Sequence, residues 1–122
     1  PKPLLFAVTV LTSMAPGELP GYGENLSGLA ADLAAGGQAW GLDGVVCSPL
    51  EAEKVHSTCG KNFITVTPGV RFADGDAGDQ KRVMTPAAAK AIGSDYIVVG
   101  RPITAAADPV AAYERCVAEF VD

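Results

Sequence analysis

The chain has 122 residues, of which 48% are hydrophobic and 19% are charged. This length and composition predict one folded unit, residues 1–122, with a hydrophobic core, and they argue against global disorder. The formal net charge of −5 argues against a general nucleic-acid-binding or acidic-membrane surface. The apolar runs are far shorter than the roughly 20 residues that span a bilayer.

The first half of the chain predicts a strand, a long loop, a helix and a second strand. Leu4–Leu11 is apolar without polar alternation, so we expect a strand buried on both faces. A loop rich in Pro and Gly follows over Ala15–Gly23. Glu24–Ala35 is predicted to be a helix, and Gly44–Cys47 is the next strand. The expected buried stripe of this helix consists of Leu26, Leu29, Ala30 and Leu33.

The second half repeats this alternation. A helix is expected after Ser48, a good N-cap, with proline at the first turn. Phe63–Thr67 and Asp95–Gly100 have the composition of buried strands. Two further helices are expected, one from Thr85 to Ile92 and one from Asp108 to the chain end. Strands alternating with helices predict an α/β fold with a parallel sheet, either an open doubly wound sheet or a closed barrel.

The cysteine and histidine content argues against a metal centre. Cys47, Cys59 and Cys116 have no C-x-x-C or zinc-cluster spacing, so we expect three reduced thiols and a cytoplasmic location. His56 is the only histidine and is expected on a helix surface. No metal and no other cofactor is predicted.

The residues that could bind a ligand follow the predicted strands, where α/β folds build their sites. Thr12 follows the first strand, Arg71 the third, and Gly100 with Arg101 the fourth. Glycine lets a ligand approach the backbone, and an arginine fork suits a phosphate. Two such loops on successive strands favour a phosphate site over two surface salt bridges.

The segment Asp74–Arg82 contains several carboxylates and glycines, which suggests a calcium loop. It lacks the twelve-residue ligand order and the terminal glutamate of such loops. A lid that closes over the ligand fits better, and Gln80 could then contact a phosphate or an amide-bearing ring.

Five motifs together resemble bacterial orotidine 5'-phosphate decarboxylase over nearly the whole chain, and their order matches its carboxyl-terminal half. They are Val8–Met14, Gly41–Pro49, Val66–Arg71, Asp76–Arg82 and Val99–Thr104. The resemblance implies a TIM (β/α)8 barrel, to which this chain supplies four βα units resembling strands five to eight. It also implies decarboxylation of orotidine 5'-monophosphate to uridine 5'-monophosphate and CO2 in pyrimidine biosynthesis, by a cytoplasmic homodimer without a cofactor.

By this resemblance the substrate-binding residues are Thr12, Arg71, Gln80, Gly100 and Arg101. Thr12 is expected near the pyrimidine, Gln80 between base and phosphate, and Arg101 on the phosphate. The family's catalytic Asp-x-Lys-x-x-Asp motif has no counterpart in this sequence. Asp79-Gln80-Lys81 imitates its first half, but the segment ends in methionine at Met84 and belongs to the lid motif. The chain alone is therefore expected to be inactive.

Three readings of the function remain open at this stage. The first is the carboxyl-terminal half of the decarboxylase, with an amino-terminal half as its partner and no nucleic-acid or membrane partner. The second is a non-catalytic half-barrel that binds a phosphorylated metabolite, and the third is another phosphate-binding barrel enzyme. The chain begins at Pro1 without a methionine, which leaves a missing upstream portion and a split chain as alternatives. An isolated half-barrel should associate with a companion chain or with itself.

Overall fold

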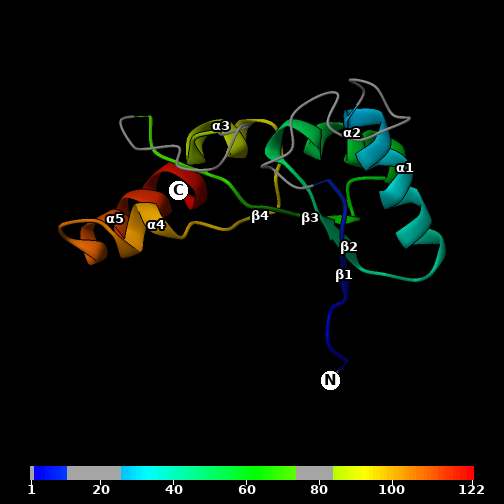
Figure 1. The fold of residues 1–122 in the computed structure, drawn as a ribbon, viewed down its shortest axis with the longest axis horizontal. Helices are drawn as coiled ribbons and strands as arrows, with labels where there is room; N and C mark the ends of the chain where they lie inside the picture. Colours follow the sequence, from blue (N-terminus) through cyan, green and yellow to red (C-terminus); the bar gives the residue numbers. More distant parts are fainter. Residues whose placement is uncertain (1, 11–25, 74–83) are drawn as a thin grey trace.

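The computed structural model describes residues 2–10, 26–73 and 84–122. Its centre is a four-stranded parallel sheet in the order β1-β2-β3-β4 (Figure 1). The strands are β1 Phe6–Val8, β2 Gly44–Val46, β3 Ile64–Thr67 and β4 Tyr96–Ile97. All four lie within the segments predicted to be strands.

The strand order decides between the two predicted sheet types. In a doubly wound sheet the order reverses near the middle, because later strands are added on the other side of the first. Here each strand is added beside its predecessor, so that Val8, Val46, Val66 and Tyr96 form one row across the sheet. An unreversed parallel order is that of a barrel wall.

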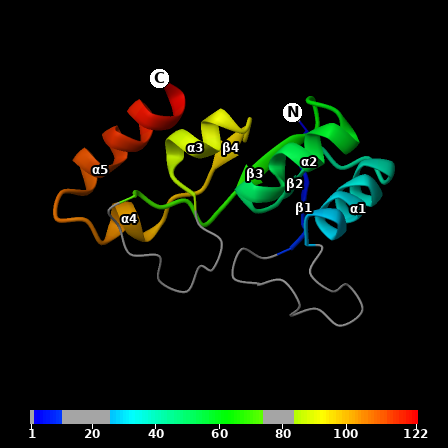
Figure 2. The same ribbon diagram turned by 90° about the horizontal axis from the view of Figure 1, so that it is seen from above.

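The helices follow the order of the strands. Figures 1 and 2 both place α1 and α2 at one end of the molecule and α4 and α5 at the other. Their bounds are α1 Leu26–Ala39, α2 Pro49–Cys59, α3 Pro86–Ala91, α4 Arg101–Thr104 and α5 Pro109–Cys116, followed by a π-helical turn η1 Val117–Val121. None of the helices described is long and apolar enough to cross a membrane.

Three helices begin at polar N-caps, of which Ser48 was predicted as a cap and Thr85 and Asp108 as helix starts. The side chains of Ser48, Thr85 and Asp108 each accept a hydrogen bond of 3.1 Å from a backbone amide of the first turn. A proline follows each cap, where its missing N–H costs no helical hydrogen bond. The predicted starts of α2, α3 and α5 are thus confirmed.

The core lies between one face of the sheet and helices α1 and α2. It consists of Ala34, Val45, Cys47, Ala52, Val55 and Phe63. The predicted stripe of α1 is wrong in part, because Leu33 is 45% exposed whereas Ala31 and Ala34 are buried. Alanines on the buried face let α1 approach its neighbours closely, so the small side chains rather than the leucine face the core.

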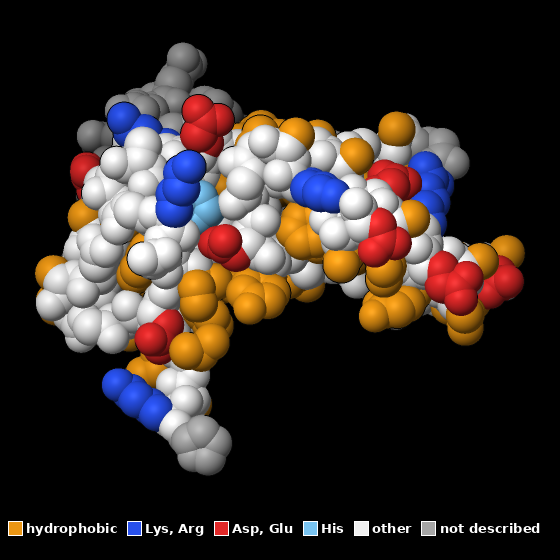
Figure 3. Space-filling model, turned by 180° about the vertical axis from the view of Figure 1, so that it is seen from behind, with side chains coloured by type: hydrophobic (Ala, Val, Ile, Leu, Met, Phe, Trp, Pro, Cys, Tyr) orange, Lys and Arg blue, Asp and Glu red, His pale blue; other side chains and the backbone are white. Residues whose placement is uncertain are grey.

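The other face of the sheet is open. Paired residues of parallel strands point to the same side of the sheet. In the row that contains Val8 and Tyr96, these two residues are 61% and 56% exposed. The prediction that the first strand is buried on both faces is therefore wrong for this chain, because no layer of the described residues covers that face and β1 is an edge strand. Figure 3 shows hydrophobic side chains gathered at the surface near the amino-terminal extension.

Candidate functional site at the carboxyl edge of the sheet

Three of the five predicted site residues lie at one edge of the sheet. Arg71 follows β3, and Gly100 with Arg101 follows β4. These strands are neighbours, and their pairing continues beyond β4 through a 3.0 Å hydrogen bond from the amide of Val98 to the carbonyl of Thr67. The fold thus brings the two predicted phosphate loops to adjacent positions. Thr12 and Gln80 lie outside the described residues.

Arg71 is a buried cation, with 7% of its surface exposed. Its Nη1 donates a 3.0 Å hydrogen bond to the carbonyl of Val70, and no carboxylate of the described segments pairs with it. A buried arginine is ordinarily paired with a negative group, because burying an uncompensated charge is costly. The guanidinium of Arg71 is therefore suited to an anion supplied from outside the described residues.

Gly100 and Arg101 form the second part of the site. Gly100 is the N-cap of α4, and its carbonyl accepts hydrogen bonds from the amides of Ile103 and Thr104 at 2.9 and 3.0 Å. A Cβ atom on Gly100 would meet no atom within 4 Å, so the backbone is open to a ligand on that side. Because α4 has only four residues, the positive charge here comes from the exposed Arg101 side chain rather than from a helix dipole.

The backbone on either side of residues 74–83 is tied together beside Arg71. Val70 and Met84 form an isolated parallel bridge, and the Arg71 amide donates a 3.0 Å hydrogen bond to the Met84 carbonyl. The predicted lid segment, which contains Gln80, therefore leaves and rejoins the described structure next to the Arg71 backbone.

Two features at this edge escaped the sequence reasoning. Glu51 is completely buried in the first turn of α2, where a helix N-terminus stabilises a carboxylate. A local signal exists, because Ser48 and Glu51 have the spacing of a capping box. The second feature is Arg115 of α5, whose guanidinium carbon lies 3.9 Å from the centroid of the Phe72 ring. No local pattern marks this contact between residues distant in sequence.

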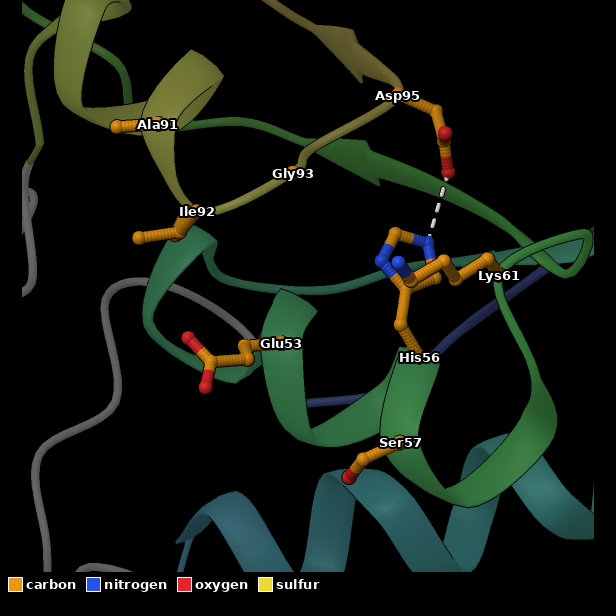
Figure 4. A pocket seen from close by; sticks show the side chains of 8 residues that line it. All are labelled: Glu53, His56, Ser57, Lys61, Ala91, Ile92, Gly93 and Asp95. Carbon is orange, nitrogen blue, oxygen red and sulfur yellow. Dashed lines mark hydrogen bonds and ion pairs between the residues drawn. The ribbon is translucent and has the colours of Figure 1, made fainter.

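The opposite edge contains a cavity of about 470 Å³, drawn in Figure 4 and lined by Glu53, His56, Ser57, Lys61, Ala91, Ile92, Gly93 and Asp95. His56 is half-buried on α2, and its Nε2 lies 2.9 Å from Asp95 Oδ2. The same carboxylate oxygen accepts hydrogen bonds from the amide and the hydroxyl of Thr65 at 2.8 and 3.1 Å.

Hydrogen-bond counting assigns the roles in this network. The Thr65 hydroxyl accepts a 3.1 Å bond from the Asp95 amide, so its own hydrogen points to the carboxylate. Asp95 therefore only accepts at Oδ2, and His56 Nε2 is the donor. The predicted helix-surface histidine thus ties α2 to the starts of β3 and β4, which is a structural role at the edge where barrels place stabilising residues.

The thiols and acidic groups form no metal centre in the parts of the chain that the structure covers. No group of three His, Cys, Asp or Glu side chains is placed there as metal ligands. Cys47, Cys59 and Cys116 form no disulfide bond. Burial raises the pKa of Cys59, and burial together with the nearby Glu119 carboxylate raises the pKa of Cys116. Both thiols are therefore held in their protonated, weakly nucleophilic form.

Comparison with known proteins identifies relatives over nearly the whole chain. The model of the orotidine 5'-phosphate decarboxylase / HUMPS family matches residues 1–116. An orotidine 5'-phosphate decarboxylase of Nitratidesulfovibrio vulgaris strain DP4 is 58% identical over 119 residues, which are 97% of this chain and 51% of that protein. One of Sodalis glossinidius is 56% identical over 89% of this chain and 44% of its own length. The chain thus spans about half the length of these relatives.

A solved structure confirms the predicted fold class. The crystal structure of orotidine 5'-phosphate decarboxylase from Lactobacillus acidophilus matches with a TM-score of 0.78 and 44% identity, over 98% of this chain and 50% of that chain. The four parallel strands in unreversed order are therefore half of a TIM (β/α)8 barrel. On the family match and the identity to these relatives, the chain belongs to the orotidine 5'-phosphate decarboxylase / HUMPS family.

Proposed function

We propose that this chain is the carboxyl-terminal half of an orotidine 5'-phosphate decarboxylase and binds the substrate phosphate at the carboxyl edge of its sheet. The observation that carries the proposal is the buried Arg71 without a carboxylate partner in the described segments, beside the loop of Gly100 and Arg101. Guanidinium groups bind phosphate through paired, charge-assisted hydrogen bonds.

Phosphate binding serves the reaction at a distance. The phosphate is remote from the carboxylate that leaves, so its binding energy is available to close a lid and to hold the ring. Gln80, in the segment that begins and ends beside Arg71, is proposed to reach the phosphate and the base from that lid. Thr12, after β1, is proposed to contact the pyrimidine.

The carbon–carbon chemistry is assigned to the partner half. When the bond to the carboxylate breaks, CO2 leaves and its bonding electron pair remains on the ring carbon. An ammonium group must stabilise this charge and then donate a proton to the same carbon, while carboxylates position the ammonium. The Asp-x-Lys-x-x-Asp motif with this role in the family is absent from the 122 residues.

Two apolar surfaces support an amino-terminal half as partner. One is the open sheet face with Val8 and Tyr96, and the other is a groove of about 320 Å³ between β4 and the helical end formed by α5 and η1. Apolar area of this kind is ordinarily covered. The other four strands of a barrel would enclose the open sheet face, and the strand that pairs with β4 would lie beside the groove. A cytoplasmic homodimer of the complete barrel is part of the proposal.

A non-catalytic phosphate-binding half-barrel and another phosphate-binding barrel enzyme are the alternatives. The matching family is named for orotidine 5'-phosphate decarboxylase and for a second group, HUMPS, so membership alone does not decide between the decarboxylase and another enzyme. The identity of 58% to a protein named orotidine 5'-phosphate decarboxylase favours the decarboxylase over both.

The test joins this chain to the amino-terminal half of the Nitratidesulfovibrio vulgaris relative and measures labelled CO2 released from carboxyl-labelled orotidine 5'-monophosphate. The joined barrel is expected to release CO2, and the chain alone is expected to release none. Release by the chain alone at a comparable rate would contradict the division of roles. A joined barrel that binds uridine 5'-monophosphate without releasing CO2 would instead support the binding module.

A further inference from the structure

We infer that Arg115 is a positioning residue for phosphate binding, acting on Arg71 through the ring of Phe72. The inference rests on the proposed function, because it assigns a cause for the placement of one proposed phosphate ligand. It adds a residue of the last helix to the site, although Arg115 itself contacts no proposed substrate atom.

The contact between Arg115 and Phe72 has the geometry of a stacked cation–π pair. The guanidinium carbon lies 3.9 Å from the ring centroid, well within the roughly 6 Å over which such pairs attract. Phe72 is buried, so the contact is shielded from water on the side of the ring. Arg115 Nε donates a 2.8 Å hydrogen bond to Glu119 Oε2, which fixes the plane of the guanidinium.

This stacking holds the segment that bears Arg71 from a second side. On one side the Arg71 amide is bonded to the Met84 carbonyl. On the other, the next residue, Phe72, is held against α5. With the backbone fixed before and after it, the Arg71 side chain has fewer orientations to lose when a phosphate binds, so the affinity rises through preorganisation.

Helix α5 also packs against α4, which begins at Arg101. One helix therefore borders both proposed phosphate loops, and the stacking of Arg115 connects it to the loop after β3. The ion pair with Glu119 is exposed and by itself stabilises little. The contact with Phe72 is the part of this cluster that reaches the site.

The test measures KM, kcat and the affinity for uridine 5'-monophosphate in the joined barrel. Arg115→Lys retains the charge but loses the planar stack, and Phe72→Leu retains an apolar side chain but loses the ring. A cation–π pair contributes about 0.5–1 kcal/mol, which converts to a rise of roughly two- to fivefold in KM and Kd. The value of kcat is expected to stay unchanged, and Phe72→Tyr is expected to restore tight binding.

Two comparisons separate positioning from simple stabilisation. The double variant R115K/F72L is expected to bind no more weakly than either single variant, because both remove one contact. Glu114→Gln, on the same helix, is the control and should leave KM unchanged. Unaltered KM and Kd in R115K and F72L, with only a lowered Tm, would overturn the inference. If the unsubstituted joined barrel fails to bind uridine 5'-monophosphate, the proposed function fails instead.

Discussion

The two edges of the sheet use charged side chains in opposite ways. At the amino edge, Asp95 Oδ2 accepts three hydrogen bonds from His56 and Thr65, and Asp43 Oδ2 accepts a 2.8 Å bond from the Leu5 amide. At the carboxyl edge, the buried Arg71 has no carboxylate partner among the described residues. The charged groups at the amino edge are paired within the chain and serve stability, whereas the buried Arg71 makes the carboxyl edge the one that we propose to bind an anion.

The largest effect is expected from removing the arginines of the carboxyl edge. In the joined barrel, R101A and R71A should each weaken the binding of uridine 5'-monophosphate by about 100-fold, because hydrogen bonds to a charged group contribute about 1.5–3 kcal/mol each. Isothermal titration calorimetry against uridine 5'-monophosphate and against uridine separates the phosphate contribution. Affinity for uridine itself should hardly change.

The matched control for this experiment is Lys54→Ala, which removes an exposed cation of α2 outside the proposed site. It should leave both affinities unchanged. Equal losses in K54A and R101A would indicate a general charge effect and would remove the phosphate assignment.

The next effect should appear at the amino edge and in stability alone. Asp95→Ala removes the acceptor of three hydrogen bonds and leaves the Thr65 amide unsatisfied. We expect the free energy of unfolding to fall by about 2 kcal/mol, below the sum of the separate bonds because the Asp95 side chain is 33% exposed. Urea denaturation measures this change, with Ser57→Ala as the control on the rim of the same cavity.

The same variant sharpens the comparison between the edges. In the joined barrel, D95A should bind uridine 5'-monophosphate as tightly as the unsubstituted protein does. A loss of affinity comparable to that of R101A, without a loss of stability, would show that the amino edge takes part in binding.

The sequence could predict those parts of the structure that depend on residues close together in the chain. Ser48, Thr85 and Asp108, each followed by proline, mark helix starts, and the apolar runs mark the strands. The exposure of Val8 was not predictable, because an apolar pattern does not tell whether the covering layer belongs to the same chain. The stacking of Arg115 on Phe72 was equally hidden, because it depends on how α5 returns to the sheet.

In the candidate site too, the sequence predicted some properties and not others. Glycine and arginine after successive strands predicted the positions of Arg71, Gly100 and Arg101 on one edge. The burial of Arg71 and the absence of a carboxylate partner among the described residues depend on tertiary packing, which the sequence does not display. These two properties turn a loop arginine into a candidate anion ligand.

The smallest effect is expected for the chemical reactivity of two thiols, Cys59 and Cys116, which lie on different helices. Cys59 ends α2, the helix of His56, and Cys116 follows Arg115 on α5. Both have a pKa raised above the ordinary value of 9.0, by burial first and, for Cys116, by the Glu119 carboxylate. The protonated thiols therefore contribute stability that is fully present below the pKa of the unfolded chain and is lost as the pH rises through the folded value.

Alkylation with iodoacetamide between pH 7 and 10 checks this expectation residue by residue, with each modified cysteine identified by mass spectrometry. Both thiols should react more slowly than a free cysteine at the same pH, and their rates should still rise at a pH where the rate of a free cysteine has levelled off. Added uridine 5'-monophosphate should slow the reaction of Cys116 in the joined barrel, because a bound phosphate would restrain α5 through Arg71 and Phe72. Cys59 provides the internal control, and equal protection of both thiols would mean that the ligand stabilises the whole barrel rather than the carboxyl edge.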